Sequence, residues 1–413
     1  MGNGNQIGGR AIILPVLCGG IIMGLALGTR HVQGLFLLPV TLEHNWSRET
    51  FGFAIALQNL VWGLAQPFTG MIADRFGSGK VVAVGIVAYA VGLCLMTVSN
   101  TPAGFALSAG VLIGIGLSGT AFGVIYGAIS RMVPPERTSW ALGVAGAIGG
   151  LGQFAMVPGA QRAIAAMGWS QTLIALACAF GLSFFAAFAL RDRVARNASL
   201  AGQTQTLRAA MHEAFTYRSF WLLNLGFLAC GFQLAFIAVH LPAYLSDKGL
   251  SATDGVTALA IIALTNVVGT YYSGLFGGIY RRKYLLAGIY FSRAFAMLLF
   301  VALPLTPLSV YVFAAVMGLL WLGTAPLTNG LVSQIFGLQY VSTLFGFVFL
   351  GHQIGGFLGV WLGGYMFDLT GSYSVVWTIG IGLGVVAGLL HWPINDSRIE
   401  RPGREQSTKP VAA

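Results

Sequence analysis

The sequence predicts an all-α membrane protein with twelve transmembrane helices, arranged as two six-helix halves in parallel repeat. The chain of 413 residues is 56% hydrophobic and only 8% charged, whereas a soluble domain carries about 25% charged residues. Turn and charge signals divide it into twelve apolar runs, and its two halves align with a constant offset. Basic residues gather on alternate loops, as expected of a multi-pass protein.

Each apolar run is long enough to cross a bilayer, which takes about 20 residues as an α-helix. Several runs contain glycine or proline, which helices in lipid tolerate when neighbours satisfy the freed backbone groups. The first run is too long for a signal-peptide core of about 7–15 residues, so we expect it to be retained. The expected spans are 12–41, 51–74, 80–99, 102–130, 140–163, 169–191, 219–245, 253–279, 284–303, 309–335, 342–366 and 374–395.

The lysines and arginines orient these spans. Twelve crossings place both termini and the loops after spans 2, 4, 6, 8 and 10 on one side, which holds 17 of the 22 basic residues. Basic loops stay in the cytoplasm, so we expect a protein of the inner (plasma) membrane with both termini cytoplasmic. The net charge of +10 is then a topology signal and does not indicate a nucleic-acid partner. The 17 residues are Arg10, Arg75, Lys80, Arg131, Arg137, Arg191, Arg193, Arg196, Arg208, Arg218, Arg281, Arg282, Lys283, Arg398, Arg401, Arg404 and Lys409.

An internal repeat with an offset of 203 residues divides the chain. The matching pairs are Gly28 and Gly231, Pro39 and Pro242, Lys80 and Lys283, Gly143 and Gly346, and Gly168 and Gly371. We expect an N-terminal half (1–191), a cytoplasmic linker (192–217), a C-terminal half (218–396) and a cytoplasmic tail (397–413). Repeated halves are typical of transporters, whose binding sites lie near the bilayer midplane between the repeats.

The loop after the second span reads "GMIADRFGSGK" (70–80). It resembles the signature loop of the major facilitator superfamily, although Gly79 stands where that signature has a basic residue. Its second-half counterpart, "GGIYRRK" (277–283), keeps the basic end but lacks the aspartate. The resemblance implies that the loop latches one conformation through Asp74 and Arg75; the alternative is a solvated loop that carries topology charges. The matching positions are Gly70, Asp74, Arg75, Gly77 and Lys80.

Within the superfamily, the chain is similar to the monocarboxylate porter and oxalate–formate antiporter group. The similarity is carried by "GTRHVQGLFLLPV" in span 1, "VIYGAISRMVPPER" ending span 4 and "FGFVFLGHQIGGFLG" in span 11. In that group a basic residue of span 11 falls where His352 stands, which implies a binding role for His352. The acid and the arginine that the group has in span 8 are replaced here by Asn266 and Thr270.

Two side chains at membrane depth point to an anionic ligand. No Asp or Glu falls in the middle of a span, yet Arg30 does, and a charge at the bilayer centre costs at least about 2.5–3.5 kcal/mol. An anion would supply the missing charge, bound between Arg30 of span 1 and His352 of span 11, with His352 also carrying a proton. The alternatives are an Arg30 that snorkels or binds helix carbonyls, and a neutral His352 satisfied by a neighbouring helix.

Neutral polar side chains complete the expected substrate site. Such amides also bond across helices, with an average contribution of about 0.6 kcal/mol. They are Gln58, Asn59, Tyr126, Gln233, Asn266 and Asn329. The sequence leaves open whether His31, His240 or Arg293 is functional. The four cysteines lie in apolar runs without ligand-like spacing, so we expect no metal site and no cofactor.

These features favour a secondary transporter of a small organic anion, with a monocarboxylate as the first expectation, by proton symport or anion exchange. The alternative is an exporter of hydrophobic drugs or a carrier of neutral solutes, which the many aromatic residues and the missing arginine of span 8 would fit. We do not expect an enzyme, because the sequence has no HExxH, no GxSxG in a strand–helix setting and no phosphate loop. We expect a monomer in the lipid bilayer.

Overall fold

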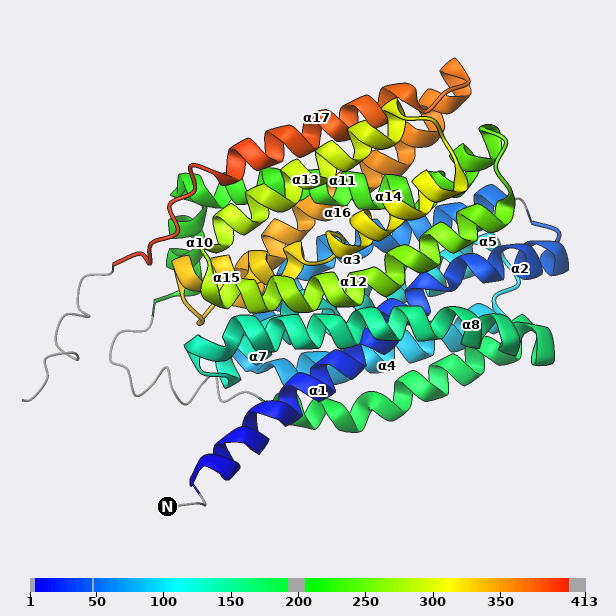
Figure 1. Ribbon diagram of the computed structural model, residues 1–413. Helices are drawn as coiled ribbons and strands as arrows, with labels where there is room; N and C mark the ends of the chain where they lie inside the picture. The colour runs from blue at the N-terminus through cyan, green and yellow to red at the C-terminus, as the bar shows by residue number, and fades with distance from the viewer. Residues whose placement is uncertain (1–3, 47, 192–204, 401–413) are drawn as a thin grey trace, which may run out of the picture.

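The computed structural model describes residues 4–46, 48–191 and 205–400, and the regular elements in these ranges are all helices (Figure 1). The first half contains α1 (Gly4–His31), η1 (Gln33–Phe36), α2 (Leu37–His44), α3 (Arg48–Phe76), α4 (Ser78–Val98), α5 (Pro102–Phe105), η2 (Ala106–Leu112), α6 (Ile113–Thr120), α7 (Phe122–Met132), α8 (Pro135–Leu182) and η3 (Ser183–Leu190). A connecting helix, α10 (Leu207–Thr216), follows. The second half contains α11 (Arg218–Asp247), α12 (Ala252–Ile279), α13 (Arg282–Ala302), α14 (Pro307–Leu319), α15 (Thr324–Phe336), α16 (Val341–Thr370) and α17 (Ser374–His391).

The helices make the twelve predicted spans. Among the described residues, ten segments are long and apolar enough to cross a membrane. One of them, Pro135–Leu190, has 56 residues and is bent at Gly168, where φ is +81°, so it supplies two spans. The twelfth is α3, which has 29 residues and whose mean hydropathy is lowered by Gln58, Gln66 and Asp74. Of the predicted linker, 192–204 lies outside the described residues and α10 forms the remainder.

The backbone shows the internal repeat. Gly168 and its repeat-mate Gly371 both have positive φ, +81° and +67°, a conformation that glycine adopts without strain. The fourth span is interrupted in each half, at Ala121 between α6 and α7 and at 320–323 between α14 and α15. The two halves therefore bend at corresponding places.

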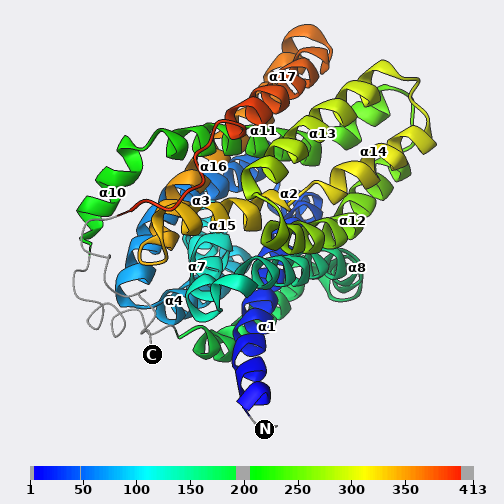
Figure 2. The same ribbon diagram turned by 60° about the vertical axis from the view of Figure 1, so that its left-hand side comes forward.

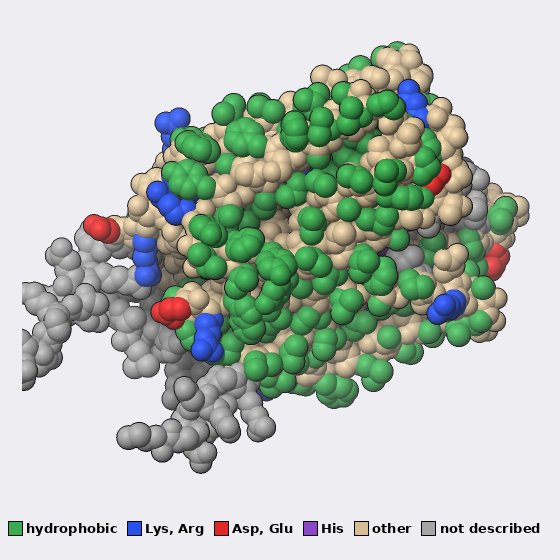
Figure 3. Space-filling model, in the orientation of Figure 1, with side chains coloured by type: hydrophobic (Ala, Val, Ile, Leu, Met, Phe, Trp, Pro, Cys, Tyr) green, Lys and Arg blue, Asp and Glu red, His purple; other side chains and the backbone are tan. Residues whose placement is uncertain are grey.

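Both termini of the described chain lie at one end of the helix bundle, which we call the terminal end (Figures 1 and 2). It also holds α7, α10 and α15. Charged side chains gather at the two ends of the surface in Figure 3, and the belt between them is largely hydrophobic. Large apolar side chains on this belt are exposed, such as Phe185 at 72%. This pattern fits a protein with its long axis across a bilayer.

Two helix pairs join the halves through glycine. A Cβ on Gly143 of α8 would lie 2.7 Å from the Cα of Gly274 in α12, and a Cβ on Gly346 of α16 would lie 2.8 Å from the Cα of Pro67 in α3. Gly143 and Gly346 are repeat-mates, so α8–α12 and α3–α16 are equivalent contacts. In both, backbone packs directly on backbone.

Side chains satisfy the backbone groups that the interrupted fourth spans set free. The Gln66 amide donates to the Ser118 carbonyl oxygen at 2.9 Å. In the second half Arg293 donates to the carbonyl oxygens of Leu320, at 3.0 Å, and Trp321, at 2.5 Å. Such partners are required because lipid offers none to a broken helix.

Candidate functional site

Arg30 lies in the last turn of α1, just before the short helix η1. Its guanidinium is directed toward α3, where it donates to the side-chain oxygen of Asn59. The Arg30 Cζ atom lies 5.3 Å from the centroid of the Trp62 ring. In the described part of the chain no carboxylate pairs with Arg30. The cation is therefore held inside the bundle by a neutral amide and an aromatic face.

Several buried hydrogen-bonding atoms in the segment 29–33 have no partner in the described part of the chain. They are Arg30 Nε, the Thr29 hydroxyl, and both amide atoms of Gln33, all of them buried. Buried polar atoms are nearly always hydrogen-bonded, so this set can accept a polar ligand or water. Gln33 was not among the predicted residues, although it stands only three residues after Arg30, at the start of η1.

A chain of polar contacts links Arg30 to the other half of the molecule. The Asn59 carbonyl oxygen accepts from the Gln353 amide at 3.2 Å, and Gln353 Oε1 lies 3.2 Å from His352 Nδ1. The structure thus brings three predicted residues, Arg30, Asn59 and His352, into one connected set across α1, α3 and α16. Both Arg30 and His352 remain partly exposed.

Aromatic side chains form a layer on the terminal side of this set. The Phe349 ring is stacked on His352 with centroids 5.3 Å apart, and it lies 4.9 Å from Trp62 and 6.2 Å from Phe122. Phe227 lies 4.8 Å from the His352 ring on another side. Aromatic rings from both halves therefore pack against the terminal side of the polar residues that connect Arg30 to His352.

Two predicted residues, Gln58 and Gln233, serve helix packing within their own halves. The Gln58 amide donates to the Ala109 carbonyl oxygen at 2.6 Å, and the Gln233 amide donates to that of Gly380 at 2.9 Å. Both side chains are fully buried. In this conformation neither amide nitrogen is available to a ligand.

The remaining predicted residues, Tyr126, Asn266 and Asn329, are buried near the α8–α12 contact. Asn266 Oδ1 accepts from the backbone amide of Leu322 and from the Thr270 hydroxyl, both at 3.0 Å. Asn329 Oδ1 accepts from Ser130 at 3.3 Å, across the halves, while its amide nitrogen has no partner. The buried Tyr126 hydroxyl also lacks a partner.

The three residues left open by the sequence have distinct surroundings. The His31 side chain is exposed. His240 Nε2 lies 2.9 Å from the Val360 carbonyl oxygen. Arg293 is fully buried among the carbonyls described above.

At the terminal end, Asp74 of α3 binds the start of α16. Its carboxylate accepts from the backbone amide and the hydroxyl of Thr343, each at 2.7 Å, and from the Ser342 amide at 3.3 Å. Arg131 of α7 donates to it at 2.7 Å. An anion at a helix N-terminus interacts favourably with the helix dipole, so this carboxylate holds a helix of the opposite half.

The other residues of the signature loop have different surroundings. Arg75 is exposed, with its Cζ 5.2 Å from the Phe76 ring, so the guanidinium that pairs with Asp74 is that of Arg131. This role of Arg131 could not be predicted from the sequence, because the pairing depends on how α7 packs. A Cβ on Gly70 would lie 2.5 Å from the Ser342 carbonyl oxygen, Gly77 turns the chain with φ +95°, and Lys80 is exposed.

A second contact repeats this arrangement at the α8–α12 side. Arg282 donates to the Ser139 hydroxyl at 2.5 Å across the halves, and also to Gln334. Ser139 is the repeat-mate of Ser342, and Gln334 that of Arg131. Repeat-related residues therefore join the two halves at two places at the terminal end. One contact is centred on the Asp74 carboxylate and the other on the Arg282 guanidinium.

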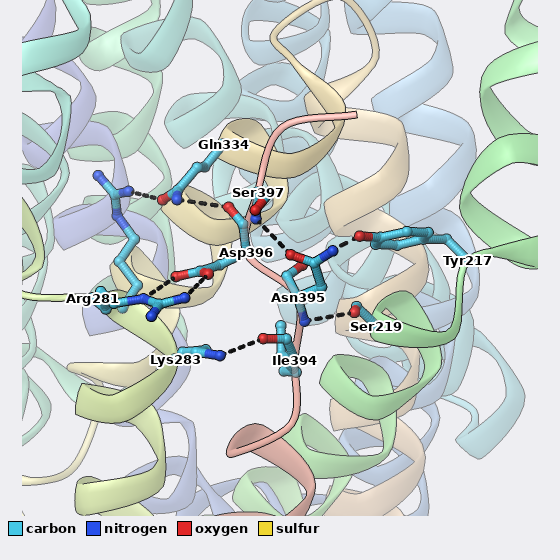
Figure 4. A network of polar contacts seen from close by, with 10 residues as sticks. Tyr217, Ser219, Arg281, Lys283, Gln334, Ile394, Asn395, Asp396 and Ser397 are labelled. Atoms are coloured by element: carbon cyan, nitrogen blue, oxygen red, sulfur yellow. Dashed lines mark hydrogen bonds and ion pairs between the residues drawn. The ribbon is translucent and has the colours of Figure 1, made fainter. Parts of the chain in front are cut away.

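The segment after α17 joins this second contact to the rest of the half (Figure 4). Gln334 donates to the Asp396 carbonyl oxygen at 2.8 Å, and Arg281 pairs with the Asp396 carboxylate at 2.5 and 3.1 Å. Lys283 donates to the Ile394 carbonyl oxygen at 2.7 Å. The hydrogen bonds from Arg281 lower the pKa of Asp396 below its usual value.

The halves separate toward the opposite end. Phe357 lies three helical turns beyond Gly346 on the same face of α16, yet it is 45% exposed. Gln161 lies three turns beyond Gly150 on α8 and is also exposed, whereas Gly150 packs against Asn266 and Val267. The halves are therefore joined at the terminal end, while the same helix faces are uncovered at Phe357 and Gln161 toward the opposite end.

Comparisons with known proteins agree with this architecture. The chain is 25% identical to the "Probable sulfoacetate transporter SauU" of Cupriavidus necator over 88% of this chain and 92% of that one. It is 23% identical to monocarboxylate transporter 13 of Rattus norvegicus, over 89% and 86% of the two chains. The crystal structure of the E. coli fucose:proton symporter FucP shares the fold, with a TM-score of 0.66 at 15% identity over 92% of this chain and 98% of that one.

The family itself follows from a match along most of the chain. The family model described as Major Facilitator Superfamily covers residues 16–360. This range includes the signature loop, the interrupted fourth spans and both glycine contacts between the halves. The chain belongs to the major facilitator superfamily, and is a multi-pass membrane transporter of that family.

Proposed function

We propose that this transporter carries a small organic anion, with a monocarboxylate as the expected cargo, by proton symport or anion exchange. The observation that carries the proposal is the state of Arg30. Its guanidinium donates to Asn59 of α3, no described carboxylate pairs with it, and its own Nε, like the polar atoms of the nearby Thr29 and Gln33 in the sequence, is buried without a partner. A carboxylate matches the planar fork of a guanidinium and would supply the missing charge.

The relatives support the same class of substrate. One carries the name of a sulfoacetate transporter and another that of a monocarboxylate transporter, and both names refer to small organic anions. In this chain we place the anion against Arg30 and Asn59, with Gln33 as a further contact. His352 would contact it from the second half and take up a proton, since histidine is one of the residues that relay protons inside membrane transporters.

The arrangement of the halves supports a mechanism of alternating access. We place the protein in the inner membrane with the terminal end in the cytoplasm, because that end carries most of the basic residues. The present conformation then faces outward. Asp74 acts as the latch of this state, within the signature loop formed by Gly70, Asp74, Arg75, Gly77 and Lys80. Its contacts with α16 must break before the site can face inward.

Replacement of Arg30 by glutamine tests the proposal. Glutamine keeps a hydrogen-bonding amide but has no charge, so we expect anion uptake into proteoliposomes to fall to the level of empty vesicles. Carboxylates should no longer raise the Tm of the purified variant. The matched control is Arg162→Gln, which removes an exposed arginine at the opposite end and should leave both properties unchanged.

Two results would contradict the proposal. Carboxylate uptake that survives Arg30→Gln would remove Arg30 from the mechanism. Stabilisation of the native protein by uncharged amphiphiles, with none by acetate, lactate or sulfoacetate, would favour an exporter of hydrophobic compounds instead.

A further inference from the structure

A second buried guanidinium, that of Arg293 in α13, has no carboxylate partner among the described residues. The side chain is 0% exposed. Two of its contacts are the carbonyl oxygens that the α14–α15 break sets free. The third is a sulfur atom: Arg293 Nη1 lies 3.2 Å from Cys230 Sγ of α11.

Groups able to donate hydrogen bonds lie around this sulfur. Besides Arg293, the Thr324 hydroxyl of α15 lies 3.3 Å from it, and His352 of α16 lies within interaction distance. The hydroxyl of Tyr290, in α13, is buried without another partner and lies beside the same sulfur. A thiol accepts hydrogen bonds only weakly, whereas a thiolate is an anion that such a ring of donors would stabilise.

The buried positive charge of Arg293 also favours a thiolate at Cys230. A buried ion without a counterion costs several kcal/mol, and the carbonyl end of α14 offsets only part of a full positive charge. No Asp or Glu lies in the middle of a span anywhere in the sequence. Cys230 is 1% exposed and is the acidic group in direct contact with Arg293.

We propose that Cys230 is the proton carrier of the transport cycle, paired with Arg293 as a thiolate before loading and present as a thiol after it. This inference rests on the proposed function, which it narrows to proton symport. The proton arrives on His352 and passes to Cys230: the N–H bond of the imidazolium breaks as the S–H bond forms. The products are a neutral imidazole and a thiol, so the total charge of the pair is unchanged.

The chain of polar contacts from Arg30 to His352 would couple the binding of the organic anion to the binding of the proton. His352 connects to Arg30 through Gln353 and Asn59, so an anion bound at Arg30 favours the arrival of a proton at His352. The other titratable groups near Cys230 are Tyr290 and, behind it, His391 of α17, whose ring stacks on Tyr290 at 4.9 Å. From α12 the neighbouring polar group is Asn266, which is neutral.

A transport experiment separates coupling from binding. In Cys230→Ala and Cys230→Ser, uphill uptake driven by a pH gradient should be lost, because neither side chain ionises. Counterflow exchange of labelled carboxylate at equal pH, and the rise in Tm on adding carboxylate, should remain. Cys178→Ala removes an exposed cysteine and serves as the matched control. Gradient-driven uptake that persists in both Cys230 variants would overturn the proposal.

A spectroscopic experiment leaves Cys230 in place and so does not depend on the folding of its variants. The triple variant Cys18→Ala, Cys94→Ala, Cys178→Ala retains Cys230 alone. Its infrared S–H stretching band should be absent at high pH and appear on acidification between about pH 9 and pH 5. A band of constant intensity over this range would overturn the proposal. If uptake requires Arg30 but is unaffected by Cys230, the anion site stands and the proton carrier alone is wrong.

Discussion

Replacing Asp74 by asparagine should shift the protein away from the conformation closed at the terminal end. Asparagine keeps one acceptor oxygen but turns the other into a donor, so its amide nitrogen must face either Arg131 or Thr343, and facing Arg131 would place donor against donor. With the nitrogen toward Thr343, the two bonds that Thr343 donates to one carboxylate oxygen, both 2.7 Å long, are lost. Hydrogen bonds to a charged group contribute about 1.5–3 kcal/mol each. We take about 3 kcal/mol for the pair, which lowers the ratio of closed to open molecules about a hundredfold.

Distances between spin labels would measure this shift. One pair, at Arg137 and Leu338, reports the terminal end, and the other, at Gln161 and Tyr365, the opposite end; all four side chains are exposed. The background lacks Cys18, Cys94 and Cys178. We expect the first distance to lengthen and the second to shorten in Asp74→Asn.

Asp396→Asn is the matched control for this experiment. It also removes a carboxylate paired with an arginine, but that pair lies within one half. Identical distance distributions in Asp74→Asn and the unmutated protein would refute the reasoning, because the Thr343 contacts would then contribute nothing to closure.

Two further predictions concern stability. Gly274→Ala should lower the Tm, because its Cβ would lie 2.3 Å from Gly143 Cα and such overpacking costs about 1–3 kcal/mol of stability. The control Gly278→Ala, whose Cβ would lie 3.7 Å from its nearest neighbour, should leave the Tm unchanged. Equal Tm values for the two variants would contradict the close approach of the two backbones. Arg281 lowers the pKa of Asp396, so this pair stabilises the fold above the ordinary carboxylate pKa near 4 and loses that effect as the pH falls below it. Thermal unfolding should therefore show Asp396→Asn to be less stable than the unmutated protein at pH 7, with the difference vanishing in acid. The difference should be small, because Arg281 is largely exposed. A difference that stays constant at every pH would contradict the ion pair.

The helix count, the repeat and the bends at Gly168 and Gly371 could be predicted because they depend on local properties: apolar length, and the conformational freedom of glycine. The direction of individual polar side chains could not. Asn59 and Gln58 are neighbours in sequence, yet one faces Arg30 and the other donates to Ala109. A helix turns by about 100° per residue, so the rotation of α3 decides which of the two amides faces the site.

Contacts between helices that are distant in the sequence could not be predicted either. The partner of Asp74 is Arg131 and not the adjacent Arg75, because the packing of α7 against α3 brings Arg131 to the carboxylate. In the same way, Cys230 looked like a small apolar residue in an apolar run. Only the packing of α11, α13 and α16 shows that its sulfur lies among donors.

The interrupted fourth spans make the two halves electrically unequal. At the first break the neutral side chains of Gln66 and Thr69 donate to one carbonyl oxygen, whereas at the second the guanidinium of Arg293 donates to two. An uncharged donor is evidently sufficient for such a carbonyl. The positive charge of Arg293 is thus surplus to the needs of the fold. The proposed exchange of a proton at Cys230 would give that charge a counterion in one state of the cycle and withdraw it in the other.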